Sequence, residues 1–227
     1  MRKLCVLLVL ALAASLAFAD AKTDSTERLT NASTVLKQIM GAPDKGIPGE
    51  VFDGAKCILV VPNLVKGGFV FGGKHGRGVA TCRTGKGWSA PAFVSVGGGS
   101  WGLQIGVQGV DLVLMVMNDR GMQHLLSNKF QVGGEASAAA GPVGRHASAG
   151  TDWKAETEIL TYSRAKGLFA GVTLEGAVVQ QDDDSTVAIY GRKIDQKSIL
   201  SGAVAAPEVT ESFLSAVKWA SAQAKAQ

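Results

Sequence analysis

One stretch of the sequence collects side chains that could bind an anion. Between Gly54 and Val110 the chain has no Asp or Glu, yet it carries six Lys or Arg residues. Such asymmetry makes a surface electropositive and suits an anionic partner. Basic groups donate charge-assisted hydrogen bonds to phosphate oxygens, and a nearby tryptophan ring is favoured at the head-group level of a membrane. The predicted anion-binding residues are Lys66, Lys74, His75, Arg77, Arg83, Lys86 and Trp88. The alternative interpretation is a set of ordinary solvated side chains around a β-domain.

A second pattern suggests nucleophilic catalysis. Residues 98–102, GGSWG, match G-x-S-x-G, in which a sharp strand-to-helix turn exposes the nucleophilic serine. Residues 103–109 alternate like a strand and contain glycines, so Ser100 is predicted to lie in a strand or bend. The three histidines show no paired metal-binding spacing, and no metal or cofactor is predicted. A secreted serine hydrolase that uses Ser100 is the alternative function, and a structural envelope protein is a third.

The N-terminus resembles a secretory leader. Arg2 and Lys3 precede an apolar stretch over residues 6–18, which is shorter than the roughly 20 residues that a membrane-spanning helix needs. Residues 17–19, AFA, offer the small-x-small pattern of a cleavage site. We expect a signal peptide over 1–19, a single domain over 20–227, and a periplasmic or secreted product. Cys57 and Cys82 remain after cleavage; an even number in an oxidising compartment permits a disulfide, and their places in strand-like runs allow two separate buried thiols instead.

The elements that must position these residues are mostly strands. Runs such as CILVVP, RGVATCR and DLVLMVM are rich in Val, Ile and Leu and are separated by turn residues. Many of the 29 glycines interrupt strand patterns, which indicates bulges and sharp bends. Amphipathic helices are predicted from Asp24 to Met40 and from about Pro207 onward, with a short helix over 119–127 and a turn at 182–184 that caps the segment 185–190. The predicted class is α+β: a strongly curved or barrel-like antiparallel sheet with flanking N- and C-terminal helices.

Several motifs in one order resemble the SYLF domain, a lipid-binding family. The matching segments are AKCILVVP (55–62), KGGFVFGG (66–73), GRGV (76–79), WSAPAF (88–93), GGSWGLQIG (98–106), AGPVGR (140–145) and YSRAKGLFAG (162–171). The resemblance covers residues 30–220, nearly all of the expected mature chain.

The resemblance implies binding of anionic phospholipid, or of a membrane surface, without enzymatic activity. It also implies that the GGSWG segment is a structural motif of the family. No nucleic acid is expected as a partner, and actin, which some family members are named for, is not expected in a bacterial envelope. We therefore expect an exported, non-enzymatic lipid-binding protein.

Overall fold

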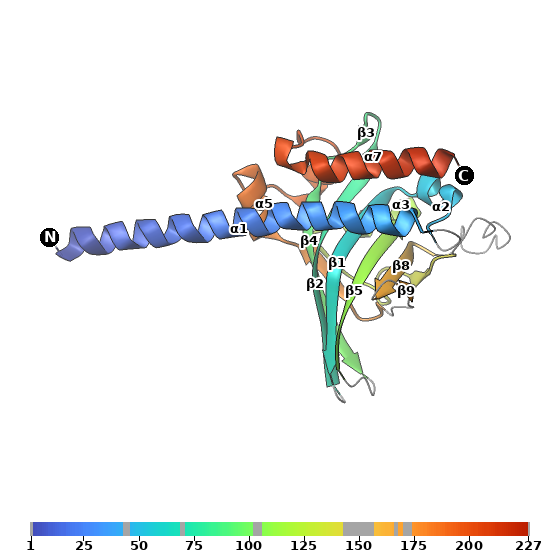
Figure 1. Ribbon diagram of the computed structural model, residues 1–227, viewed down its shortest axis with the longest axis horizontal. Coiled ribbons are helices and arrows are strands. Elements are labelled where there is room, and N and C mark those ends of the chain that lie inside the picture. Colours follow the sequence, from blue (N-terminus) through green and yellow to red (C-terminus); the bar gives the residue numbers. More distant parts are fainter. Residues whose placement is uncertain are drawn as a thin grey trace.

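The computed structural model describes residues 2–42, 46–68, 71–101, 106–142, 157–165, 168–169 and 174–226. Its centre is a curled β-sheet, and helices from both ends of the chain lie across it (Figure 1). The predicted α+β class, with a strongly curved sheet and flanking terminal helices, is confirmed.

The described strands follow the order β6-β10-β4-β2-β1-β5-β8-β7, with β3 beside β2 and β9 beside β8. Their pairing is antiparallel except between β7 and β8, which run parallel, so the sheet is mixed. The bounds are β1 Cys57–Gly68, β2 Phe71–Thr84, β3 Gly87–Trp88, β4 Ala92–Trp101, β5 Gly106–Val116, β6 Lys129–Gln131, β7 Ala138–Ala140, β8 Ile159–Ala165, β9 Leu168–Phe169 and β10 Val178–Gln181.

Alternate side chains of the central strands point to opposite faces of the sheet, and each face has its own core. Ile58, Val60 and Val79 point to the side that α1 and α7 cover, here called the α1 face. Leu59, Val61 and Ala80 point to the other side, which residues of α3 and α6 cover, here called the α6 face. Both faces are therefore apolar, and the strands read as nearly continuous hydrophobic runs.

The helices of the α1 face pack as the apolar stripes of the sequence predict. Leu29, Leu36 and Ile39 of α1 share one core cluster with Phe213 and Val217 of α7. Figure 1 shows these two helices side by side across the sheet. The helix bounds are α1 Arg2–Met40, α2 Gly49–Gly54, α3 Asp119–Leu126, α5 Asp183–Tyr190, α6 Gln196–Leu200, the 3₁₀ helix η2 Glu208–Thr210 and α7 Glu211–Lys225.

Helix α1 begins earlier than predicted. It is continuous from Arg2, because no glycine or proline interrupts residues 2–40. Asp24 consequently lies inside the helix and does not cap it; its carboxylate accepts a hydrogen bond from Arg28 instead. The N-terminal part of α1 extends beyond the sheet (Figure 1). Within the described part of the chain, no helix combines the length and apolarity that a bilayer crossing needs.

Strands β1, β2, β4 and β5 continue past the helix-covered body. Residues 64–68, 71–77, 97–101 and 106–110 of these strands pair in the order β4-β2-β1-β5 and form what we call the glycine-rich extension. Figure 1 shows β1 and β2 running on well beyond α1 and α7. At the opposite end of the same two strands, Cys57 and Cys82 face each other and form a disulfide. Of the two states that the sequence left open, the structure has the disulfide.

Candidate functional site

The predicted anion-binding residues lie in three separate places. Lys66 and Lys74 project from the extension on the α6 face, whereas His75 and Arg77 project from β2 on the α1 face. Arg83, Lys86 and Trp88 lie at the other end of the sheet, around the turn between β2 and β3. The sequence thus groups residues that strand alternation and strand length keep apart.

Lys66 and Lys74 are direct cross-strand partners, in register between β1 and β2. Lys74 is buried, and its Nζ donates a hydrogen bond to the Glu175 carbonyl oxygen at 2.8 Å. Burial, followed by the like charge of Lys74, lowers the pKa of Lys66. Burial also lowers the pKa of Lys74, although the Glu175 carboxylate opposes that change. Like charges directly opposite each other destabilise a sheet, so this pair is costly in the absence of a nearby anion.

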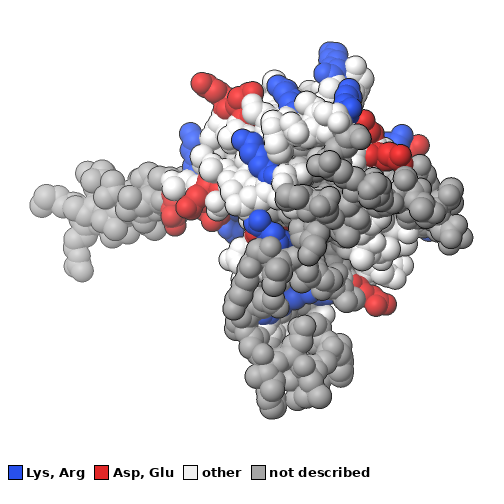
Figure 2. All heavy atoms as spheres, turned by 45° about the vertical axis from the view of Figure 1, so that its right-hand side comes forward, with Lys and Arg blue, Asp and Glu red and all other residues white. Residues whose placement is uncertain are grey.

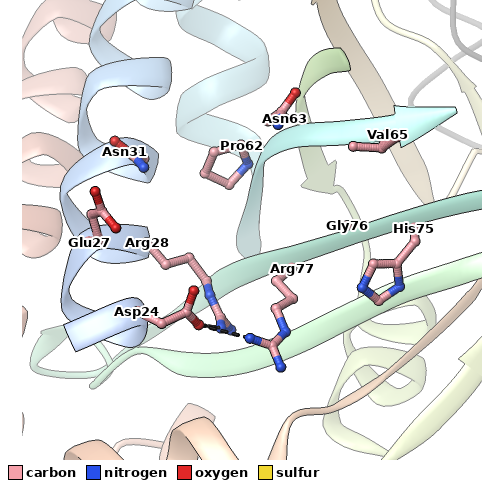
Figure 3. Close-up of a pocket in the computed structure, with 10 residues that line it drawn as sticks. All are labelled: Asp24, Glu27, Arg28, Asn31, Pro62, Asn63, Val65, His75, Gly76 and Arg77. Atoms are coloured by element: carbon pink, nitrogen blue, oxygen red, sulfur yellow. Dashed lines mark hydrogen bonds and ion pairs between the residues drawn. The ribbon is translucent and has the colours of Figure 1, made fainter. Parts of the chain in front are cut away.

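His75 and Arg77 line a cleft of about 270 Å³ between α1, β2 and the part of β1 at residues 62–65, where the register of β1 shifts (Figure 3). The α1 side contributes Asp24, Glu27, Arg28 and Asn31, and the β1 side contributes Pro62, Asn63 and Val65. The Asp24 carboxylate accepts hydrogen bonds from Arg77 at 2.8 Å and from Arg28 at 2.9 Å. The sequence separation of Asp24 and Arg28 makes them neighbours on one helix face.

The second acid of this network is Asp182, at the start of α5. Its carboxylate accepts a hydrogen bond from the buried Arg28 guanidinium at 2.9 Å, and Arg77 Nε lies 3.7 Å away. Burial alone would raise the pKa of Asp182, but hydrogen bonds from the Ser185 backbone and hydroxyl and from Arg28 outweigh it and hold that pKa below its usual value. The two positive charges of the arginines are balanced by the two negative charges of the aspartates. Arg77 therefore adds little net positive charge to the cleft.

Arg83 and Trp88, in the third group, make contacts that stabilise the fold. The Arg83 guanidinium lies 4.5 Å from the Trp88 ring centroid and donates to the carbonyl oxygens of Phe52 and Ala55, both at 3.0 Å. Trp88 Nε1 donates to Ser221 of α7. These contacts tie β2 and β3 to α2 and α7. Lys86 is exposed in the turn.

Ser100 lies inside β4, in register with Gly72 of β2. A nucleophile elbow needs a sharp turn from a strand into a helix. β4 instead continues to Trp101, which agrees with the prediction of a strand. The backbone at Ser100 therefore does not form a nucleophile elbow.

Basic side chains do not cover the described surface of the body uniformly. On the face shown in Figure 2, Lys and Arg side chains are interspersed with Asp and Glu over the described part of the body. The described residues of the extension itself include Lys66, Lys74, His75 and Arg77 and no acid, although Asp24 and Glu175 from other segments lie against Arg77 and Lys74.

Two acids important to these basic residues escaped the sequence analysis. The run 182–184 is predicted as a turn that caps 185–190; in the structure Asp182 alone is the cap, its side chain accepts a hydrogen bond from Ser185 N, and α5 already begins at Asp183. The pairing of Asp182 with Arg28 was not predicted. Glu175 lies outside the basic stretch, and its contact with Lys74 was not predicted. Both contacts join segments about 100 or more residues apart, and no local spacing signals them.

This architecture defines an α+β domain built on a curled sheet and two terminal helices. A family profile described as "Las17-binding protein actin regulator" matches residues 97–220. The chain belongs to this family, the Ysc84 or SYLF family, as the sequence motifs predicted.

Related proteins extend well beyond the shared region. An SH3 domain-containing protein of Schizosaccharomyces pombe is 38% identical over 179 residues, which cover 77% of this chain and 41% of the relative. Protein YSC84 of Saccharomyces cerevisiae is 33% identical, over 78% of this chain and 38% of its own length. The human SH3 domain-containing YSC84-like protein 1 is 31% identical, over 74% of this chain and 50% of its own. The chain thus spans half or less of the length of these relatives.

Proposed function

We propose that this chain is an exported, non-enzymatic protein that binds anionic phospholipid through its glycine-rich extension. The observation that carries the proposal is the extension itself: it projects from the body, and its described residues carry basic but no acidic side chains. A projecting element can reach a bilayer surface without the helix-covered body approaching it. Each basic residue near an anionic membrane contributes about 1 kcal/mol to binding.

Within the extension, Lys66 is the residue best suited to a first test. Arg77 is bound to Asp24, and Lys74 is buried against Glu175, so changing either would also disturb the fold. Lys66 is only half-buried, and its pKa is lowered by burial and by the Lys74 charge, which an anionic phosphate would offset. Losing its charge should weaken binding without removing a described hydrogen bond.

Vesicle sedimentation tests the proposal. The protein should sediment with vesicles of phosphatidylglycerol and phosphatidylcholine, and much less with phosphatidylcholine alone. Lys66→Gln should weaken this binding about fivefold, and higher salt should weaken it further by screening. Lys225→Gln, which removes the same charge from the exposed end of α7, is the matched control. Equal effects of the two substitutions would place the lipid site elsewhere.

Two features support export. The sequence of residues 1–19 has the organisation of a signal peptide, and disulfides such as Cys57–Cys82 persist mainly in oxidising compartments. Intact-mass measurement of protein recovered from the cell envelope or the medium should give a chain that begins at Asp20. A product that still contains residues 1–19 would contradict cleavage.

The names of the relatives raise actin regulation as a second candidate. The matched family is described by Las17 binding and actin regulation, and several relatives carry SH3 domains. An exported chain in a bacterial envelope would not meet actin, so under the export proposal lipid is the more suitable partner. Co-sedimentation with actin filaments would favour this second candidate, provided that the chain is found to remain in the cytoplasm.

A further inference from the structure

Lys74 contacts a turn, residues 174–177, that lies outside the basic stretch of the sequence. Residues 174–177 come directly before β10 and pack on the α6 face, with Leu174 and Ala177 in the core of that face. A Cβ at Gly98 of β4 would lie 2.9 Å from the Gly176 carbonyl oxygen, so the turn contacts the strand backbone where only glycine leaves room. The turn therefore sits directly against the sheet beside Lys74.

Hydrogen bonds fix this turn in place. Gly176 N donates to Val132 O at 2.9 Å, Val132 N donates to Ala177 O at 2.8 Å, and Ala177 N donates to Leu174 O at 2.8 Å. Lys74 Nζ then donates to Glu175 O at 2.8 Å. The backbone of Glu175 is thus anchored to Lys74, while its side chain is exposed and passes over Gly133.

These contacts hold Glu175, an acidic residue, beside Lys74, one of the two paired lysines. The two lysines face each other in register, and the backbone of Glu175 is held beside Lys74 by a partly buried hydrogen bond. On the premise that the extension binds lipid, we propose that Glu175 is a built-in competitor of the anionic headgroup. Its carboxylate offsets the charge of Lys74 in the unbound protein, and the headgroup binds by replacing that carboxylate.

Electrostatics supports this role. Burial lowers the pKa of Lys74, and the Glu175 carboxylate acts in the opposite direction. Lys66 has Lys74 as its main charged neighbour, which lowers the pKa of Lys66 further. A phosphate oxygen placed between the lysines would stabilise both ammonium groups, whereas the Glu175 carboxylate acts on Lys74. Removal of the carboxylate should therefore raise the affinity for an anionic surface.

The test is Glu175→Gln, which keeps the side-chain shape and the backbone carbonyl that Lys74 uses. The variant should sediment about fivefold more tightly than the unchanged protein with vesicles of phosphatidylglycerol and phosphatidylcholine, the effect of one charge near such a surface. Glu208→Gln makes the same charge change at the start of η2, far along the chain from the extension, and should have much less effect. Equal gains for both variants, or no gain for Glu175→Gln, would overturn the inference.

A second measurement separates this inference from the proposed function. An NMR titration of the Lys74 side chain, without lipid, should show a lower pKa in Glu175→Gln than in the unchanged protein. An unshifted titration would refute the counter-ion role even if the vesicles bind. Conversely, an unchanged protein that binds no anionic vesicle would refute the proposed function, and the competitor role with it, although the titration could still show that Glu175 acts on Lys74.

Discussion

Replacing Asp182 by Asn should destabilise the fold substantially. Asn caps helices about as well as Asp, so the substitution retains the cap on α5 and removes the charge that faces buried Arg28. Breaking a buried ion pair costs about 3–5 kcal/mol, because the remaining charge stays buried without its partner. Arg28 keeps its bond to Asp24, which is half-exposed, so we expect about 2–3 kcal/mol. In a domain of this size that corresponds to a fall in Tm of about 5–10 °C.

The chain contains a matched control for this substitution. Asp195 caps α6 as Asp182 caps α5: in each case the side chain accepts bonds from the backbone N–H and hydroxyl of the serine three residues later. Asp195, however, is exposed and has no arginine partner among the described residues. Asp195→Asn should therefore leave the urea denaturation midpoint nearly unchanged. If both substitutions lower the midpoint equally, capping accounts for the loss and the buried pair contributes nothing.

Three further outcomes are expected. Replacing Cys57 and Cys82 together by Ala should cost about 3 kcal/mol through the lost cross-link, as the urea midpoint would show, and alkylation of the native protein without reductant should label neither cysteine. Because the folded-state pKa of Asp182 is depressed, its ionised carboxylate contributes to the free energy of unfolding at neutral pH, and this contribution should be lost as pH falls below about 4. The unfolding free energy of Asp182→Asn should therefore depend less on pH in that range than that of the unchanged protein. Ser100→Ala should leave vesicle binding intact, and a fluorophosphonate probe should not label the unchanged protein; stoichiometric labelling at Ser100 would establish an enzyme.

The elements followed from local patterns. The apolar stripe of α1 and the run of strands are encoded by spacing within each segment, and both are observed. Strand order was not predictable, because β10 pairs with β4 and β6 across long stretches of chain. The early start of α1 was missed because Asp24 matched a capping pattern, although no helix-breaking residue precedes it.

The site was predictable in composition but not in geometry. The absence of acids in the sequence around Lys66 and Lys74 correctly described the extension itself. It could not show that Glu175 is anchored to Lys74, or that Asp182 reaches Arg77, because both acids come from distant segments. Arg83 was grouped with the other basic residues by sequence proximity. It lies near the far end of the long strand β2, one turn before β3, and there it contacts the Trp88 ring.

The position of β10 constrains how this chain can fold during synthesis. β10 fills the space between β4 and β6, yet it is made after β8, when most of the sheet has already emerged. Until residue 181 leaves the ribosome, the facing edges of β4 and β6 lack their shared partner, and open strand edges can pair with other chains. The covering segments α5, α6 and α7 come later still. A nascent chain that pauses before this point exposes unpaired edges, so holding factors that shield such edges should influence the yield of folded protein more than they influence its final stability.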